Sequence, residues 1–324
     1  MNRRTFIRTI GLCWLATPPV PRAQPAGKMR RIGLLMVEEF NPDQRQRIRA
    51  ALRERGWTEG ENLVIESRSA RGNVQLLRAL ADELVKLNVE LIVGAGTAAT
   101  TAAKNATTRI PIVIYAAGDP VGTGLVASLA RPGGNVTGTT TMTPEIATKR
   151  LELVHELLPA AARIGELENS NNPLFRVTRD ARERSYRLVG LQPIFIEVAA
   201  IGEIENAVLE VARRGGKALI VSPDPLFGEG AEQLGRTAQR TGLPLIVESG
   251  ALTEGAVVSF SISWDELNRQ FASFVDRILK GAKAADLPVE QPTKFELGIN
   301  LKTAKALGIT VPQSILRRAD EVIQ

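Results

Sequence analysis

Two aspartates, Asp119 and Asp224, each stand directly before a proline and shortly after an apolar run that is typical of a buried strand. An ionised carboxylate only accepts hydrogen bonds, so both positions suit an ammonium, amide or hydroxyl donor of a ligand. Asp and Pro are also common in turns for backbone reasons alone. Paired carboxylates, such as Asp119 with Asp224 or Glu38 with Glu39, can in principle perform acid–base chemistry, but polar ligand contacts explain them equally well.

The side chains that most often perform catalysis at neutral pH are nearly absent. The sequence has one histidine, His155, whose helical spacing within 151–158 predicts a solvated helix position, and one cysteine, Cys13. It has no Walker motif, no Gly-x-Ser-x-Gly nucleophile motif and no His or Cys cluster at metal-ligand spacing. Residues 94–96 (GAG) are half of a dinucleotide fingerprint, without an acidic ribose partner at the usual spacing. We therefore expect a protein that is not an enzyme and that needs no cofactor or metal.

The stretch from 90 to 126 predicts the elements that position these side chains. Two apolar runs, 91–93 and 110–115, are each followed by a Gly-rich turn, and the small residues of 97–105 predict a helix with Thr97 at its N-cap. Strand, helix and strand in this order form the unit of a parallel α/β sheet. Ligands of such sheets bind at the carboxyl ends of the strands, where helix N-termini offer free N–H groups to a small anion. Both turns are therefore candidate ligand contacts.

The same alternation predicts the fold of the whole chain. After a Gly/Pro-rich crossing at 131–138, strands and helices alternate a second time. A long amphipathic helix over Trp264–Leu279, a strand over 295–299 and a tail helix over 314–323 follow. We predict an α/β fold with two similar doubly wound parallel-sheet lobes joined by crossing segments. The N-terminal lobe comprises residues 30–139 and about 265–288, and the C-terminal lobe comprises residues 140–264 and about 289–324.

Polar or small residues follow predicted strands in both lobes, and their placement predicts a binding cleft between the lobes. Each of them alone is explained equally well as a cap or turn residue. The candidate ligand-binding residues are Glu38, Gly96, Thr97, Ala98 and Asp119 in the first lobe, and Asn169, Asn172, Asp224 and Glu248 in the second.

The first 28 residues predict an export signal of the twin-arginine type. Arg3 and Arg4 precede a short apolar run, and a Pro-rich stretch ends near Ala23. Five of the 41 basic residues and none of the 35 acidic residues lie in this segment, which leaves 36 basic residues against 35 acidic ones. The basic balance is thus no evidence for nucleic-acid binding. We expect a periplasmic protein whose mature part has no cysteine.

Several blocks of the sequence resemble a known family. They are LVASLARPGGNVTG at 125–138, GENLVIE at 60–66, DLPVEQPTKFEL at 286–297, INLKTAKALG at 299–308 and RADEVI at 318–323. On these residues the chain resembles the substrate-binding proteins of ABC transporters of the tryptophan/tyrosine type, which have the type 1 periplasmic-binding-protein fold. The resemblance covers essentially all of the chain after the signal. It implies a ligand held between the lobes, hinge closure on binding and delivery to a membrane permease.

Carried over residue by residue, the resemblance points to the 96–98 turn, Asp119, Asn169, Asn172 and Asp224. Two positions depart from the family pattern. Glu38-Glu39-Phe40 stands where the family has small residues, and Glu168 stands where it has an apolar residue. These departures leave the ligand open and argue against assuming an aromatic amino acid. Carboxylates that point inward would favour a cationic or polyhydroxyl ligand.

Our leading hypothesis is an exported substrate-binding component of an ABC importer. It would hold a small polar solute, amino-acid-like or another small metabolite, and deliver it as a monomer to an ABC permease in the inner membrane, with no role for nucleic acid. Two alternatives stay open: a sensory ligand-binding protein for a membrane receptor, and an isomerase-type or racemase-type enzyme on the same scaffold. A DNA-binding regulator is disfavoured, because nothing before residue 30 predicts a helix-turn-helix.

Overall fold

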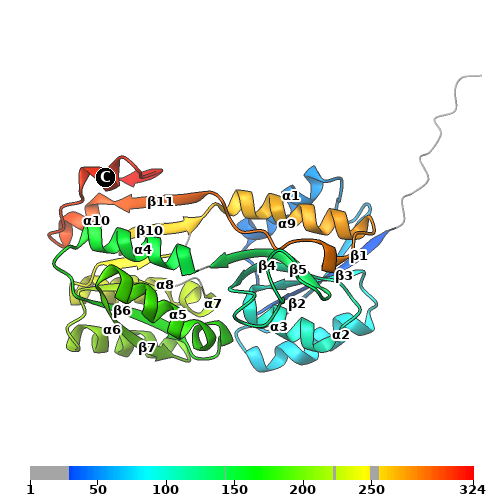
Figure 1. The fold of residues 1–324 in the computed structure, drawn as a ribbon, viewed down its shortest axis with the longest axis horizontal. Helices are drawn as coiled ribbons and strands as arrows, with labels where there is room; N and C mark the ends of the chain where they lie inside the picture. Colours follow the sequence, from blue (N-terminus) through cyan, green and yellow to red (C-terminus); the bar gives the residue numbers. More distant parts are fainter. Residues whose placement is uncertain (1–28, 143, 222–223, 249–254) are drawn as a thin grey trace, which may run out of the picture.

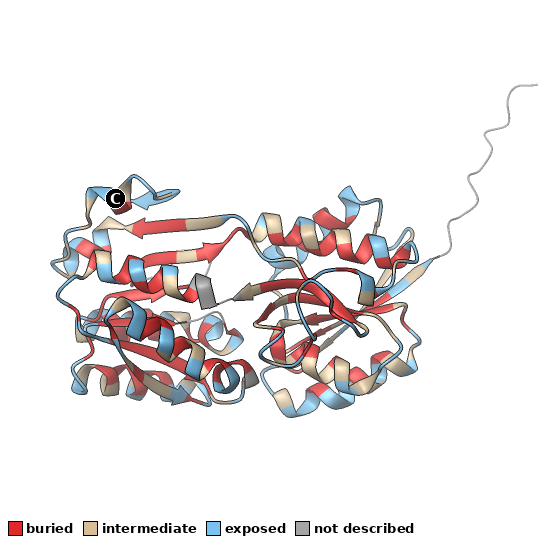
Figure 2. Cartoon of the chain, in the orientation of Figure 1, coloured by how far each residue is buried: buried red, intermediate tan, exposed pale blue. Residues whose placement is uncertain are grey.

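The computed structural model describes residues 29–142, 144–221, 224–248 and 255–324. The predicted export signal lies outside the described residues. Figure 1 shows two lobes side by side, each with a sheet between layers of helices. Figure 2 shows that the strands and the inward faces of the helices are the most buried parts of both lobes.

The first lobe contains a parallel sheet of five strands within the described residues, in the order β2-β1-β3-β4-β5. Strands β3 and β4 contain most of the two apolar runs that predict the central strands. The sequence analysis predicts only a crossing at 131–138 and misses strand β5. This strand forms because the Val and Thr residues after Gly134 favour a strand. The strands are β1 (Arg30–Met36), β2 (Leu63–Ser69), β3 (Leu91–Ala95), β4 (Ile112–Gly118) and β5 (Val136–Met142).

Helices cover both faces of this sheet. α1 (Pro42–Glu54) and α9 (Trp264–Leu279) pack on one face, and α2 (Leu77–Lys86) and α3 (Gly96–Ala106) pack on the other. α1 begins with a capping box, in which the Asn41 side chain and the Gln44 side chain each bond to the other residue's backbone N–H. α9 joins this lobe from far along the sequence and buries Phe271 and Phe274 against it.

The second lobe is built on a sheet of seven strands within the described residues, in the order β12-β11-β10-β9-β8-β6-β7. All neighbouring strands are parallel except β10 and β11. The strands are β6 (Arg163–Asn169), β7 (Gln192–Val198), β8 (Ala218–Val221), β9 (Leu245–Val247), β10 (Ala256–Ile262), β11 (Phe295–Asn300) and β12 (Glu321–Ile323). The helices are α4 (Pro144–Leu157), α5 (Pro173–Val189), α10 (Leu301–Ala306) and α11 (Gln313–Leu316) on one face, and α6 (Ile204–Arg213), α7 (Pro225–Glu229) and α8 (Ala231–Thr241) on the other.

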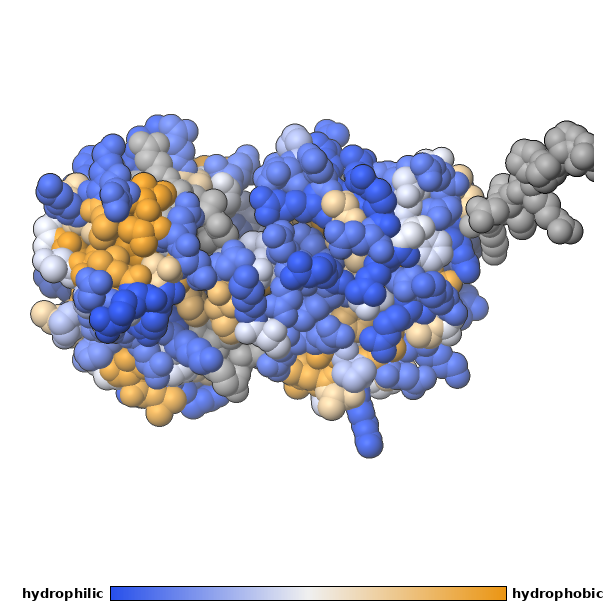
Figure 3. Space-filling model, turned by 90° about the horizontal axis from the view of Figure 1, so that it is seen from above, coloured by the Kyte–Doolittle hydropathy of each residue, from blue (hydrophilic) through white to orange (hydrophobic). Residues whose placement is uncertain are grey.

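The tail helix predicted over 314–323 is wrong. Helix α11 ends at Leu316, and the last residues form the edge strand β12 beside β11. Asp320 starts this pairing, because its N–H donates to the Leu297 carbonyl and its carboxylate accepts the Leu297 N–H. Val322 and Ile323 of β12 are exposed. Figure 3 shows that apolar surface gathers on this lobe, whereas the same side of the first lobe is mostly hydrophilic.

The described elements pass from one lobe to the other after β5, after β10 and before β11. The Ser263 N–H donates to the Lys294 carbonyl at 2.9 Å, so the second and third crossings are joined by a hydrogen bond. The Glu290 N–H donates to the Gly138 carbonyl at 2.9 Å, which joins the third crossing to β5. Because β5 continues to Met142, the first crossing begins after the predicted boundary at 139. The lobe boundaries given above stay a prediction.

Gly138 lies where β5 approaches β4 most closely, with φ +130°, and a Cβ there would lie 2.5 Å from backbone atoms of Ile114. We predict that Gly138→Ala lowers the free energy of unfolding by about 2–4 kcal/mol, because neither backbone can move aside without breaking the strand pairing. Urea unfolding followed by circular dichroism measures this. Gly134→Ala is the control, since nothing lies within 4 Å of its added Cβ. Equal stability of the two variants would contradict the prediction.

Candidate functional site

The carboxyl ends of the strands in the first lobe face the second lobe. Gly118, the last residue of β4, lies against Leu174 in the first turn of α5, and an added Cβ at Gly118 would lie 2.5 Å from the Leu174 Cδ2. This edge is where ligands of parallel sheets bind. The candidate residues can therefore be located relative to the place where the lobes meet.

In the second lobe, the candidate residues Asn169 and Asn172 both contact the carboxylate of a third candidate, Asp224. These three residues form the Asp224 trio. The Asn169 Nδ2 donates to Oδ1 at 2.8 Å, and the Asn172 Nδ2 donates to Oδ2 at 2.7 Å. Asp224 also caps α7 by accepting the Leu226 N–H. Burial raises the pKa of Asp224, and these hydrogen bonds offset only part of that effect. The protein thus supplies the amide donors that the sequence assigns to a ligand, and the trio joins the ends of β6 and β8 to α5 and α7.

Thr97 has a different position from the one predicted. The N-cap residue of α3 is Ala95, and the Thr97 side chain does not cap the helix. Its buried hydroxyl accepts the Gly118 N–H at 3.1 Å, which ties the start of α3 to the end of β4. Gly96 adopts φ +81°, a conformation that favours glycine at this sharp turn, and Ala98 is half-buried.

Asp119 closes the turn after β4. Its Oδ1 accepts the Gly122 N–H at 2.9 Å, and its own φ of 30° is unusual for a residue with a side chain. An added Cβ at Gly122 would lie 2.2 Å from the Asp119 Oδ2, so the carboxylate lies directly over this glycine. The role of Asp119 in this turn therefore explains the contacts that its carboxylate makes.

Glu38 differs from the other acidic candidates. It is half-buried after β1, and its carboxylate makes no hydrogen bond or ion pair within the described part of the chain. Burial, and then the charges of Glu229 and Glu39, raise its pKa. Glu229 ends α7 of the second lobe, so a carboxylate of each lobe lies within electrostatic reach of the other.

Glu248 forms a buried ion pair with Arg150 of α4, a residue that the sequence analysis missed. Arg150 is 1% exposed, and burial lowers its pKa against the opposing effect of Glu166. Glu248 follows β9 at the edge predicted for the site, but its partner comes from the protein. Ser249, which follows it, lies outside the described residues.

Behind the Asp224 trio lies a buried group of charges that the sequence analysis also missed. Arg182 of α5 donates to Glu166 at 2.7 Å and to Glu168, and the Tyr186 hydroxyl donates to Glu166 at 2.7 Å. Burial alone would raise the pKa of Glu166, but Arg182, Arg150 and Tyr186 outweigh it and hold that pKa below its ordinary value. The available signal was two glutamates at alternate positions of β6, because residues two apart share one face of a strand.

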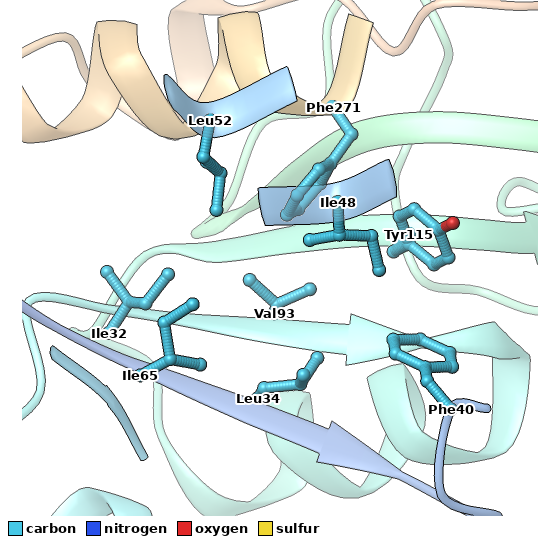
Figure 4. Close-up of a pocket in the computed structure, with 9 residues that line it drawn as sticks. All are labelled: Ile32, Leu34, Phe40, Ile48, Leu52, Ile65, Val93, Tyr115 and Phe271. Carbon is cyan, nitrogen blue, oxygen red and sulfur yellow. The ribbon is translucent and has the colours of Figure 1, made fainter. Parts of the chain in front are cut away.

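The cavity in Figure 4 is not a ligand site. It lies between the first sheet and helices α1 and α9, and its volume of about 10 Å³ holds at most one water molecule. Its nine lining residues are apolar or aromatic, and the Tyr115 hydroxyl points away from it to donate to Asn268. It is a packing gap in the core.

His155, the one histidine of the sequence, is exposed on α4. Among the described residues, no group of three or more His, Cys, Asp or Glu side chains is placed to hold a metal ion. What remains is a set of polar strand ends in two lobes that face each other.

The model of a family described as "ABC transporter substrate binding protein" matches residues 40–323. The chain belongs to this family. This confirms the resemblance drawn from the sequence, and it makes the protein a substrate-binding component of an ABC transporter. A tyrosine-binding protein of Clostridioides difficile is 29% identical over 285 residues, which cover 86% of this chain and 81% of that protein.

Two solved structures resemble the whole two-lobe fold. A domain of Streptococcus pneumoniae in complex with L-Trp is 28% identical and has a TM-score of 0.84. A ligand-free, open structure of a substrate-binding protein with adhesive properties from Clostridium difficile is 27% identical and has a TM-score of 0.66. Both matches cover 91% of this chain and 100% of the other. Together with solute-binding proteins of lower identity, they confirm the predicted two-lobe fold.

The Glu166 group generates a stability prediction. We predict that Glu166→Gln lowers the free energy of unfolding at pH 7 by about 3 kcal/mol, because Arg182 and Arg150 lose a buried counter-charge. Urea unfolding measures this, with the exposed Glu152→Gln on α4 as the control. An effect no larger than that of the control would contradict the prediction.

The same variant has a predicted pH dependence. The Glu166 carboxylate has a folded-state pKa below 4.5, so the unfolded state binds more protons as the pH falls through this value. The stabilisation is complete above this value and is lost as the pH falls towards the folded-state pKa. The stability of the natural protein should therefore fall more steeply between pH 5 and pH 3 than that of Glu166→Gln. Parallel pH profiles would show that folding does not lower the pKa of Glu166.

Proposed function

We propose that this protein is the exported receptor of an ABC importer and that it binds an amino acid, with tyrosine and tryptophan as the first candidates, between its two lobes. The observation that carries the proposal is the family match over 40–323, together with relatives of 28% and 29% identity that bind these amino acids. The better match to the L-Trp complex than to the open structure supports a lobe arrangement near the ligand-bound one.

Aromatic side chains at the carboxyl end of the first sheet support an aromatic ligand. Figure 4 shows Phe40 and Tyr115 together at this end, with their ring centres 5.5 Å apart. Trp264, where α9 begins after the second crossing, lies 6.4 Å from Tyr115. Phe40 and Trp264 are only half-buried, so each has ring surface left for contact with a ligand. This weighs against the polyhydroxyl ligand that the departures at 38–40 alone would favour.

Glu38 is the candidate that we assign to the ligand's ammonium group. It is the acidic candidate whose carboxylate stays without a hydrogen bond or ion pair in the described residues, and it lies half-buried at a strand end. An ammonium between Glu38 and Glu229 would relieve the repulsion that raises the pKa of Glu38. The other candidate residues would shape the site mainly through the backbone segments that they hold in place. They are Gly96, Thr97, Ala98, Asp119, Asn169, Asn172, Asp224 and Glu248.

The remaining parts of the proposal rest on the sequence and on the family. Export would use the twin-arginine-type signal, the permease of the transporter would be the partner, and the protein would act as a monomer without enzymatic activity. No helix in the described part of the chain is both long and apolar enough to cross a membrane.

A thermal-shift screen of residues 24–324 tests the proposal. L-tyrosine, L-tryptophan and L-phenylalanine should raise the Tm, because a ligand at a thousand times its Kd stabilises the folded state by about 4 kcal/mol. Sugars and dicarboxylates serve as the comparison set. A Tm that no amino acid raises at millimolar concentration would contradict the proposed ligand class.

Glu38→Gln tests the ammonium contact. We predict a Kd about tenfold higher by calorimetry, because a charge-assisted hydrogen bond is lost, with an unchanged Tm of the ligand-free protein. Glu39→Gln, an exposed neighbour, should leave the Kd unchanged. Since only the ionised carboxylate accepts an ammonium, affinity should also fall as the pH drops through the raised pKa of Glu38. Equal Kd values for the two variants would contradict this role.

A further inference from the structure

The contact between Gly118 and Leu174 joins the two lobes at the ends of their binding edges. Gly118 is buried at the end of β4, and Leu174 is 4% exposed in the first turn of α5. An added Cβ at Gly118 would lie 2.5 Å, 2.8 Å and 3.2 Å from the Cδ2, Cδ1 and Cγ of Leu174. The whole isobutyl group would have to move to make room. The absence of a side chain at 118 is therefore what lets the lobes come this close.

Hydrogen bonds hold both sides of this contact in place. On the first lobe, the Gly118 N–H donates to the Thr97 hydroxyl at 3.1 Å. On the second lobe, the Leu174 N–H donates to the Asn172 Oδ1 at 3.0 Å, and the Leu174 carbonyl accepts the Thr178 hydroxyl at 2.7 Å. Asn172 is in turn bonded to Asp224. The contact thus lies between two backbone segments that are well anchored, so a change in it is taken up either by the Leu174 side chain or by a movement of one lobe relative to the other.

We propose that Gly118 and Leu174 form an interlobe stop, which fixes how closely the lobes approach and thereby sets the fraction of ligand-free protein that is ready to bind. Neither residue needs to touch the ligand; both are positioning residues. The apparent Kd equals the intrinsic Kd divided by the fraction of molecules in the binding-competent arrangement. The affinity part of this inference rests on the function proposed above, whereas the effect on lobe distance does not.

Spin-label distances in the ligand-free protein test the stop directly. Residues 24–324 contain no cysteine, so labels can be placed at Ala79→Cys on α2 and Leu188→Cys on α5, both exposed. Gly118→Ala should shift the distance distribution away from that of the natural protein and raise the Kd for L-tyrosine or L-tryptophan about tenfold. Leu174→Ala removes the contact without adding atoms, and it should broaden the distribution.

The double variant Gly118→Ala/Leu174→Ala separates a stop from general damage. The alanine methyl at 118 can occupy the space that the leucine leaves, so both the distances and the Kd should return towards those of the natural protein. Gly202→Ala is the control, because nothing lies within 4 Å of its added Cβ. All variants should keep the circular-dichroism spectrum of the natural protein.

Two results would overturn the inference: a distance distribution of Gly118→Ala that equals that of the control, or a double variant that departs as far as the two single variants combined. If Gly118→Ala does not fold, an unchanged distribution in Leu174→Ala overturns it instead. If no amino acid binds to any variant, the proposed ligand is wrong, and the distances still decide about the stop.

Discussion

The passage of the chain between the lobes is the constraint on which the rest of the structure depends. The crossings after β5, after β10 and before β11 make each lobe from separate stretches of sequence. Hydrogen bonds from Ser263 to Lys294 and from Glu290 to Gly138 tie the third crossing to the second crossing and to β5. Strands that leave each sheet in a common direction therefore present their carboxyl ends to the opposite lobe. This topology supports the proposed ligand site between the lobes.

The polar residues at these strand ends have two kinds of role. One group forms hydrogen bonds within the protein and holds loops and helix ends in place. It consists of Asp224, Asn169, Asn172 and Thr97. The buried Arg182 of α5 donates to Glu166 and Glu168 of β6 and thereby fixes α5 on the second sheet. Such groups are costly to bury unless every partner is present, so they favour one arrangement of the second-lobe wall. Glu38 makes no hydrogen bond or ion pair within the described residues, and for this reason we assign the proposed ligand contact to it.

The sequence predicts the alternation and the two lobes, because buried strands and amphipathic helices leave strong periodic signals. The family is predicted from the blocks that resemble it, such as 125–138 and 299–308. The sequence places Asn169, Asn172 and Asp224 at strand ends of the second lobe, since all follow predicted strands. It does not predict their partners: a carboxylate at a strand end looks the same whether a ligand or a neighbouring amide satisfies it. The predictions of an N-cap at Thr97 and of a helix in place of β12 are wrong for related reasons. A Thr before a helical run resembles an N-cap, and three strand residues carry too little periodicity to outweigh a helix.

The most direct test of the two-lobe account is hydrogen–deuterium exchange of residues 24–324 with and without a saturating amino acid, L-tyrosine or L-tryptophan. Binding between the lobes should slow exchange in both at once, at 38–41 and 118–120 in the first lobe and at 169–174 and 224–229 in the second. The amino ends of the strands, such as the start of β6 at Arg163, should not change. Protection confined to one lobe, or placed away from the strand ends, would contradict the account.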